Sequence, residues 1–213
     1  MRWTRTQDAL VAAARRAGVT DERVLAAVAA VNRERFVPPG AESEAALDRP
    51  IVIGSGQTTS QPSLIASMLA ALELTGSERV LEIGTGFGYQ TALLAHLAAE
   101  VYSIERIASL AERAREHLAA CGIEGVAVVV GDGTRGLPEA APFDAVVISA
   151  AAREIPAALA GQVTEGGRVV GPVGPDGAQT VVRYTVRDGQ LRDPQRLSAV
   201  RFVPLIGDEP GSG

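Results

Sequence analysis

Three glycines at alternate positions follow a short apolar run that begins at Val80: Gly84, Gly86 and Gly88. A helical pattern starts directly after them, so the order is strand, glycine loop, helix. Glycine lets the backbone adopt dihedral angles that other residues avoid and approach a ligand closely. Two later apolar runs also end in residues that suit such a site: Glu105 about 20 residues on, then Asp132 with Gly133. This arrangement is typical of a nucleotide-type cofactor site.

The spacing of this loop distinguishes two kinds of cofactor. A dinucleotide fold prefers G-x-G-x-x-G, with a pyrophosphate at the helix N-terminus. Here the third glycine comes one residue early, and Tyr89 stands in its usual place. Glu82, just before the loop, would repel a pyrophosphate but suits a cationic ligand. S-adenosylmethionine carries a sulfonium and an ammonium group, so the loop indicates this methyl donor, a tight turn without a ligand being the alternative.

The composition is that of an ordinary globular protein. A chain of 213 residues is long enough for one sizeable α/β domain. Its formal charge of -5, without a basic run, gives no support to nucleic-acid binding. No apolar stretch reaches the roughly 18 residues of a membrane span, the first residues lack the apolar core of a signal peptide, and the single Cys121 fits a reducing compartment. We therefore expect a cytoplasmic monomer with no nucleic-acid or membrane partner.

Hydrophobic periodicity predicts alternating helices and strands. Helices are expected at about 4–17, 21–32, 62–74, 89–99, 107–121 and 154–161. Strands are expected at about 79–83, 101–105, 126–130, 144–149, 168–173, 179–187 and 197–203. The pair Gly166-Gly167 predicts a turn before the strand at 168, and Asp188-Gly189 predicts a hairpin turn.

This alternation predicts the α/β class, with a mostly parallel central sheet covered by helices on both faces. Together with the glycine loop it indicates a Rossmann-like S-adenosylmethionine-dependent methyltransferase fold with an N-terminal helical extension. We expect a single methyltransferase domain over residues 1–213. Within it, residues 1–62 form the helical and substrate segment, 63–207 the Rossmann-like core and 208–213 a frayed tail.

Several segments together resemble one family. They are Arg35–Pro38, Asp48–Pro50, Ile53–Ser60, Leu81–Gln90, Ala141–Ala152 and Arg201–Ile206. From the second helix to Ile206 the chain resembles the protein-L-isoaspartate O-methyltransferases. The G-Q-T-x-S segment, Gly56 to Ser60, carries the resemblance because it is far more specific than the glycine loop. Departures fall on the substrate side, where Ser55, Thr59 and Ser63 replace the family's usual residues.

The resemblance implies methyl transfer from S-adenosylmethionine to the α-carboxylate of an isoaspartyl residue in a damaged protein or peptide. The resulting ester then collapses to a succinimide. It implies that Ser60 orients the acceptor, with Gln57, Thr58 and Thr59 shaping the substrate site. On the cofactor side it implies contacts from Glu82, Gly84, Thr85, Gly86, Gly88, Glu105, Asp132 and Gly133. Glu105 is expected to hold the ribose hydroxyls, and Asp132 to lie beside the adenine amino group.

The residues themselves support this chemistry in two ways. An acceptor carboxylate is already ionised at neutral pH, so it requires neither a general base nor a metal. The two histidines, His96 and His117, fall in expected helices away from the loop ends, and no cluster has metal-ligand spacing. The hydroxyls of residues 58–60 precede a helix N-terminus, whose free N–H groups attract a carboxylate. The alternative is that these hydroxyls only cap that helix.

Three other functions remain open at this point. A related carboxyl methyltransferase acting on a normal aspartate in a dedicated peptide substrate is suggested by Ser55, Thr59 and Ser63. A nicotinamide-dependent oxidoreductase would use the glycine loop differently. A binding module without catalysis would retain the cofactor but turn nothing over, although the intact Ser60, Glu105 and Asp132 argue against it.

Overall fold

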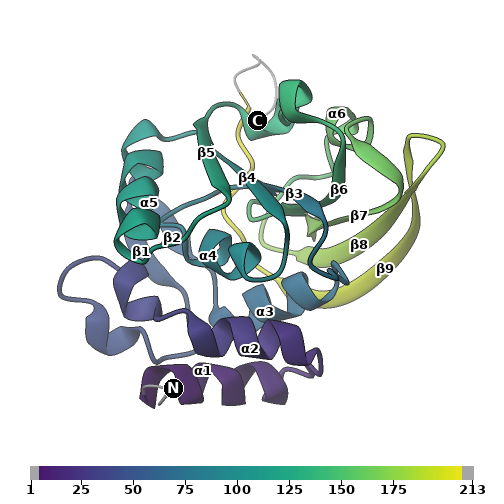
Figure 1. The fold of residues 1–213 in the computed structure, drawn as a ribbon. Helices are drawn as coiled ribbons and strands as arrows, with labels where there is room; N and C mark the ends of the chain where they lie inside the picture. Colours follow the sequence, from purple (N-terminus) through teal and green to yellow (C-terminus); the bar gives the residue numbers. More distant parts are fainter. Residues whose placement is uncertain (1–4, 208–213) are drawn as a thin grey trace.

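The computed structural model describes residues 5–207, so Thr4 and the expected tail at 208–213 lie outside the described residues. Its centre is a seven-stranded sheet in the order β5-β4-β3-β6-β7-β8-β9 (Figure 1). These strands are β3 (Arg79–Ile83), β4 (Glu100–Glu105), β5 (Val126–Val130), β6 (Phe143–Ile148), β7 (Val163–Val173), β8 (Gln179–Arg187) and β9 (Gln190–Val200). Strands β3 to β7 pair in parallel, whereas β7–β8 and β8–β9 are antiparallel.

The strand order reverses beside β3. The chain proceeds from β3 outward to β4 and β5, then returns to place β6 on the other side of β3. In open α/β sheets, ligands bind outside the carboxyl ends of the strands at such a switch point. The loops after Ile83, Glu105, Val130 and Ile148 therefore meet at one edge of the sheet.

The last part of the sheet differs from the sequence-based expectation in two places. The Gly166-Gly167 pair is not a turn before a strand, because β7 begins at Val163 and runs through it. Gly166 has a φ of 76°, and the pairing with β6 shifts register nearby, which marks a β-bulge. The expected hairpin turn at Asp188-Gly189 is confirmed, and Gln190, the residue directly after it, pairs with Arg187. The final strand therefore begins at the turn and lies at 190–200 rather than at 197–203.

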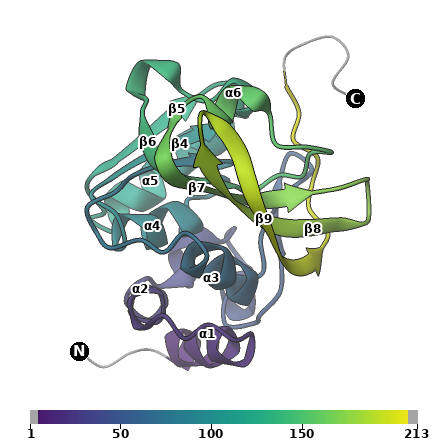
Figure 2. The ribbon, with the colours of Figure 1, turned by 90° about the vertical axis from the view of Figure 1, so that its right-hand side faces the viewer.

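Helices cover both faces of the sheet (Figure 2). They are α1 (Arg5–Arg16), α2 (Glu22–Ala30), α3 (Pro62–Ala70), α4 (Tyr89–Ala95), α5 (Ala108–Ala120) and α6 (Ala157–Ala160). In one apolar cluster, side chains of the helices α1, α2, α3 and α4 pack against Val80, Val101 and Val147 of the sheet. A second cluster fills the opposite face, where Leu159 of α6 packs. Helix α6 is shorter than expected because a residue before a proline, here Ile155, avoids helical dihedrals.

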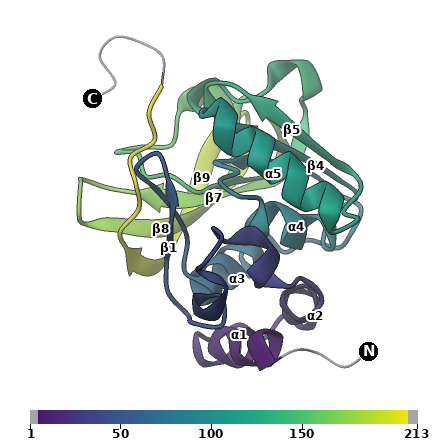
Figure 3. The ribbon, with the colours of Figure 1, turned by 90° about the vertical axis from the view of Figure 1, so that its left-hand side faces the viewer.

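A small hairpin, not anticipated as strands, precedes α3. Strands β1 (Ile51–Gly54) and β2 (Gln57–Thr59) pair in antiparallel fashion, with Ile51 opposite Thr59. The turn between them places Ser55 at a φ of 53°, between two glycines that are also left-handed. In Figure 3 this hairpin stands on the flank of the molecule where the segment after β9 also runs. Within residues 5–207, the helices are all too short or too polar to cross a membrane.

Candidate functional site

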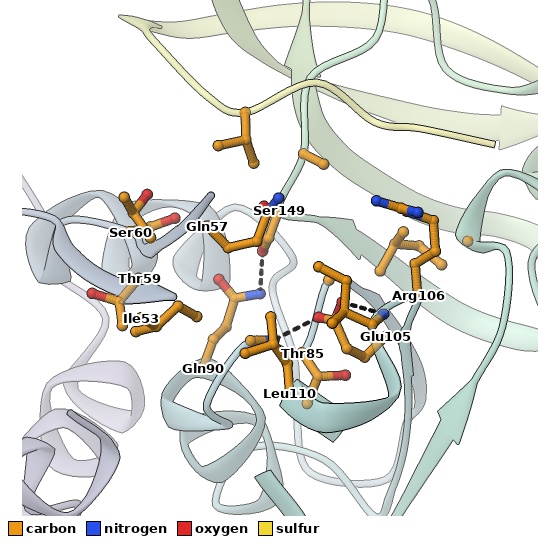
Figure 4. Close-up of a pocket in the computed structure, with 18 of the residues that line it drawn as sticks. Ile53, Gln57, Thr59, Ser60, Thr85, Gln90, Glu105, Arg106, Leu110 and Ser149 are labelled. Carbon is orange, nitrogen blue, oxygen red and sulfur yellow. Dashed lines mark hydrogen bonds between the residues drawn. The ribbon is translucent and has the colours of Figure 1, made fainter. Parts of the chain in front are cut away.

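A cleft lies at the carboxyl edge of the parallel strands, where the strand order reverses (Figure 4). Its floor comes from the ends of β3, β4 and β6, and its walls from the β1–β2 hairpin, the start of α5 and the segment after β9. The polar and glycine residues that line it are Gln57, Thr58, Thr59, Ser60, Gly84, Thr85, Gly86, Gln90, Glu105, Arg106, Gly133 and Ser149. Nine of the site residues expected from the sequence are therefore gathered in one place.

The glycine loop brings backbone, rather than side chains, to the cleft. Gly84 and Gly86 have φ angles of 94° and 56°, which side-chain-bearing residues rarely adopt. A Cβ at Gly86 would come within 3.2 Å of the Ile53 side chain across the cleft. Gly88 is different, because it faces α5: a Cβ there would lie 3.4 Å from the Cβ of Ala114. Gly88 is thus a helix-packing position, and its expected cofactor contact stays a prediction.

Glu105 is the carboxylate held closest to the glycine loop. It ends β4, lines the cleft and is only 7% exposed. The Gly86 N–H donates to its Oε2 at 2.9 Å, and the Ile107 N–H donates to its Oε1 at 3.0 Å. Each carboxylate oxygen can accept a further hydrogen bond. Glu105 therefore attaches the glycine loop to β4, and its carboxylate oxygens can still accept hydrogen bonds from a ligand in the cleft.

Glu82 lies behind the loop and is not among the residues that line the cleft, and its expected contact with a cationic ligand stays a prediction. Its side chain is fully buried. Gln90 Nε2 donates to its Oε1 at 2.9 Å, and the hydroxyls of Ser103 and Thr91 donate to its Oε2. Burial raises the pKa of Glu82 to about 7, the three hydrogen bonds opposing the shift and Glu105 adding to it. Thr85 joins this network through its hydroxyl, 2.6 Å from that of Ser103.

The raised pKa of Glu82 predicts a pH dependence of stability. Between the unfolded value of 4.5 and about 7, the folded chain holds a proton that the unfolded chain has released. The stability contributed by protonated Glu82 is thus complete below pH 4.5 and is lost as the pH rises through 7. We expect Glu82→Gln to gain about 3 kcal/mol of unfolding free energy relative to the wild type between pH 4.5 and 7. Urea unfolding at several pH values tests this; parallel curves for both proteins would contradict it.

Asp132 and Gly133 take different positions at the end of β5. Gly133 lines the cleft, and a Cβ there would lie 2.4 Å from the Ile83 side chain, so only glycine fits. The Asp132 side chain accepts hydrogen bonds from the Thr134 N–H and hydroxyl at 2.9 and 2.7 Å. It does not line the cleft but lies directly behind it. The turn thus presents the backbone of Gly133 to the cleft, with the Asp132 carboxylate next to it.

The substrate-side residues separate into two groups. Gln57, Thr58 and Ser60 line the cleft. The hydroxyl of Thr59 instead accepts hydrogen bonds from a buried arginine, Arg33 Nη2 at 3.0 Å, and from the backbone N–H of Ile51 at 3.2 Å. Although Thr59 borders the cleft, its hydroxyl holds the hairpin in place. Its expected substrate contact stays a prediction.

The N-terminus of α3 is already occupied by a carboxylate of the chain itself. Asp48 Oδ1 accepts from the Ser63 N–H at 2.8 Å, and its Oδ2 accepts from Gln61 Nε2 at 2.9 Å. The sequence suggested that the N–H groups of this helix would receive a substrate carboxylate. Asp48 fills that position, so neither the substrate nor the Ser60 hydroxyl caps the helix at Ser63. Ser60 is left bordering the cleft.

A wider groove of about 720 Å³ adjoins the cleft. It runs between the start of α3 and the β8–β9 end of the sheet, and its wall includes Ser63, Gln179 and Arg201. The residues that border both the cleft and the groove are Thr58, Ser60, Ser149 and Val203. Two hollows therefore meet at a junction that carries three hydroxyl groups.

Sequence reasoning missed Ser149 and the side chains of residues 203–206 as parts of this site. Both belong to motifs that were recognised, but neither had an assigned role. The available signal was position, because Ser149 directly follows the buried strand β6, at the sheet edge where ligands bind. The segment 203–206 begins at the end of the strand expected at 197–203; it borders the cleft, and its backbone forms hydrogen bonds with that of Ala151 at 2.8 and 2.7 Å.

The histidines were expected to lie away from the loop, and this holds for only one of them. His96 ends α4 and does not line the cleft. His117 Nδ1 lies 3.1 Å from the carbonyl oxygen of Phe87, a loop residue, on the side away from the cleft. Among residues 5–207, no group of three or more His, Cys, Asp or Glu is placed to hold a metal ion.

The fold and the site define a Rossmann-like methyltransferase. A solved protein-L-isoaspartate O-methyltransferase superposes with a TM-score of 0.84 at 28% identity, over 95% of this chain and 66% of that longer chain. A Plasmodium falciparum chain assigned the same activity and solved with S-adenosyl-L-homocysteine has a TM-score of 0.81 at 23% identity, covering 94% and 97%. These likenesses confirm the predicted fold class.

The sequence comparisons identify the family. The model of the protein-L-isoaspartate(D-aspartate) O-methyltransferase family matches residues 5–210. The protein-L-isoaspartate O-methyltransferase of Methanoculleus marisnigri is 53% identical over 89% of this chain and 86% of its own length. That of Myxococcus xanthus is 48% identical over 93% and 95%. The chain belongs to the protein-L-isoaspartate(D-aspartate) O-methyltransferase family, and the enzyme class and methyl donor predicted from the sequence are confirmed.

Proposed function

We propose that this enzyme methylates the α-carboxylate of L-isoaspartyl residues in damaged proteins or peptides, and that Ser60 orients the acceptor. The observation that supports this is the junction of the two hollows. The cleft by the glycine loop suits the methyl donor, and the adjoining groove is open along its length, as a peptide chain requires. Ser60, Thr58 and Ser149 lie where the two meet.

The cleft fits S-adenosylmethionine by the chemistry of its donors and acceptors. We assign the buried Glu105 carboxylate to the ribose hydroxyls and the open backbone of Gly84 and Gly86 to the methionine half. Gly133 lines the cleft while packing against the Ile83 side chain, and we assign its backbone, with the neighbouring Asp132, to the adenine. When bound, S-adenosylmethionine supplies a methyl group on a sulfonium centre that a carboxylate oxygen can take directly.

The protein's own contribution is to position the acceptor and exclude water. A carboxylate is ionised at neutral pH, so no side chain needs to remove a proton before methyl transfer. Hydroxyl groups at the junction can donate hydrogen bonds that hold the acceptor in line with the methyl group. The segment 203–206 borders the cleft and reduces access of solvent to it. The methyl ester formed then closes to a succinimide: the neighbouring backbone nitrogen attacks the ester carbonyl and loses its proton, and methanol leaves.

A matched pair of peptides tests the proposed activity. The protein is incubated with methyl-labelled S-adenosylmethionine and one isoaspartyl or one aspartyl peptide of the same sequence, and base-labile methyl ester is counted. Label on the isoaspartyl peptide alone is the expected result. Label on the aspartyl peptide alone would establish the alternative, a carboxyl methyltransferase with a dedicated peptide substrate.

The structure reduces the support for a dedicated aspartyl peptide substrate. Of the three departures that suggested it, Thr59 accepts from Arg33, and the Ser63 hydroxyl lies 3.1 Å from Gln61 Nε2. Both therefore have structural partners within the chain. Ser55 is exposed at the tip of the hairpin, and among the hydrogen bonds described for residues 5–207 none involves its hydroxyl. We favour repair of isoaspartyl sites accordingly.

Replacing Ser60 with alanine tests its role. We expect Ser60→Ala to lower turnover of the isoaspartyl peptide about tenfold or more, because a hydrogen bond to a charged group is lost. Affinity for S-adenosylhomocysteine should remain within a factor of two, as measured by calorimetry. Since Asp48 occupies the α3 N-terminus, thermal stability should change little. Unchanged turnover would remove Ser60 from the acceptor site.

The remaining expectations are part of the same proposal. We propose a cytoplasmic monomer that acts without nucleic acid, with residues 1–62 serving the substrate and 63–207 the methyl donor. A single cysteine, a net charge of -5 and the peptide groove support this assignment. Sedimentation analysis of the purified chain tests the monomer; a dimer at micromolar concentration would contradict it.

A further inference from the structure

Ser149 stands at the junction of the two hollows, on the wall opposite Ser60. It follows β6, and its backbone N–H donates to the carbonyl of Ile83 at 2.8 Å, which fixes it to the end of β3. A Cβ at Gly84 would lie 3.4 Å from the Ser149 Cβ, so the serine also packs against the glycine loop. Figure 4 shows its side chain directly above Gln90. The hydroxyl is thus held between the part of the cleft that suits the methyl donor and the groove.

The hydrogen bonds around Gln90 determine how this hydroxyl is used. Gln90 Nε2 lies 2.9 Å from Glu82 Oε1 and 2.9 Å from Ser149 Oγ. An amide nitrogen carries two N–H donors and accepts nothing. One N–H is directed to the buried Glu82 carboxylate, and the other is directed to Ser149. Ser149 Oγ is therefore the acceptor in this contact, and its own proton is available for another partner.

The buried end of this chain of contacts is firmly anchored. Glu82 is fully buried and also receives the hydroxyls of Ser103 and Thr91. Gln90 is only 6% exposed, at the start of α4. A buried side chain whose amide nitrogen makes two hydrogen bonds has little rotational freedom. The network Glu82–Gln90–Ser149 therefore presets the Ser149 hydroxyl as a hydrogen-bond donor into the junction.

We propose that the Ser149 hydroxyl donates a hydrogen bond to the acceptor carboxylate, on the oxygen that does not receive the methyl group, with Gln90 and Glu82 as positioning residues. This rests on the proposed isoaspartyl activity. Ser60 and Ser149 then hold the acceptor from opposite walls. The other carboxylate oxygen forms the new C–O bond as the methyl–sulfur bond of the donor breaks, and the bonding pair leaves with sulfur. Ser149 keeps its proton throughout, so the step needs no base.

Kinetics with the isoaspartyl peptide test this role. We expect Ser149→Ala to lower kcat/KM for the peptide roughly tenfold to a hundredfold, which is the loss of one hydrogen bond to a charged group. S-adenosylhomocysteine affinity should stay within twofold, and Ser149→Thr, which retains the hydroxyl, should recover most of the activity. Ser109→Ala, the same change on the exposed face of α5, is the matched control and should have no effect.

A double-mutant cycle tests the positioning role of Gln90. Gln90→Met should lower kcat/KM in the wild-type background but add little to Ser149→Ala, because it acts only through that hydroxyl. Fully additive losses would overturn the network, and a Ser149→Ala value within twofold of wild type would overturn the contact. A parallel loss of S-adenosylhomocysteine affinity would instead assign the hydroxyl to the cofactor. If the wild type methylated neither peptide, the proposed function would fail first.

Discussion

Replacing Arg33 with methionine is expected to lower the free energy of unfolding by about 3 kcal/mol or more. The Arg33 side chain is fully buried between the N-terminal helices and the substrate segment. Its Nη1 donates to the carbonyls of Ala45 and Leu47, and its Nη2 donates to the carbonyl of Arg49 and to Thr59. Methionine fills much of the volume but removes the Arg33 donors from the three carbonyls, whereas the Thr59 hydroxyl keeps the Ile51 N–H as a donor. Each buried, unsatisfied acceptor costs about 1–3 kcal/mol.

The effect should extend from stability to the substrate site. Burial lowers the pKa of Arg33, with Tyr89 and Asp48 opposing the shift, yet the guanidinium remains charged at neutral pH. It therefore acts as a permanent clamp on the segment that leads to Ser60. We expect the KM for the peptide to rise in Arg33→Met while S-adenosylhomocysteine affinity is retained. Urea unfolding and steady-state kinetics measure the two effects.

Arg35→Met is the matched control for this substitution. Arg35 lies two residues away in the same short helical turn, η1 (Arg33–Phe36), but its side chain is exposed. Surface substitutions of this kind usually change stability by less than about 0.5 kcal/mol. An equal loss of stability in both variants would show that the buried hydrogen bonds of Arg33 do not contribute to the free energy of unfolding.

Replacing Glu105 with alanine is expected to weaken S-adenosylhomocysteine binding at least tenfold and up to about a hundredfold. Hydrogen bonds to a charged acceptor are worth about 1.5–3 kcal/mol, and the proposed ribose contacts would be lost. The substitution also removes the acceptor for the Gly86 N–H, so the glycine loop loses its attachment to β4. Both consequences act on the cofactor side of the site.

Calorimetry with S-adenosylhomocysteine measures this effect directly. Glu112→Ala, on the exposed side of α5, removes an equivalent carboxylate outside the cleft and should leave the affinity unchanged. If Glu105→Ala bound as tightly as the wild type, the ribose would have to be held by another residue. The kcat at saturating cofactor should fall less than the affinity, because Glu105 does not border the acceptor junction.

Local patterns predicted most of the parallel half of the sheet. Strands β3 and β5 begin and end where the apolar runs placed them, β4 starts one residue earlier, and β6 is displaced by one residue at both ends. Strands β3, β4 and β6 are largely buried, whereas the edge strand β5 is partly exposed; all four are mostly apolar and bounded by turn residues. Strand β9 was placed late because most of its side chains are exposed and polar, which removes the hydrophobic signal. Its pairing with β8 is decided by the Asp188-Gly189 turn.

Gly84, Glu105 and Gly133 could be assigned from sequence because each lies at or just beyond the carboxyl end of an apolar parallel strand. Topology then brings Gly84, Glu105 and Gly133 to one edge of the sheet. Glu82 and Gly88 belong to the same motif, but their direction depends on side-chain alternation in β3 and on the approach of α5. Spacing along the chain carries no information about that direction.

The sequence by itself therefore determined the fold class, the family and the neighbourhood of the methyl donor. Only the tertiary structure decided which polar groups are already satisfied within the chain. Asp48 occupies the α3 N-terminus, Arg33 takes the Thr59 hydroxyl, and Gln90 leaves the Ser149 proton available. Each of these contacts joins residues from 15 to 59 positions apart. Hydrogen bonds are directional and saturable, so whether a hydroxyl is free to bind substrate depends on such distant partners, which local sequence patterns do not specify.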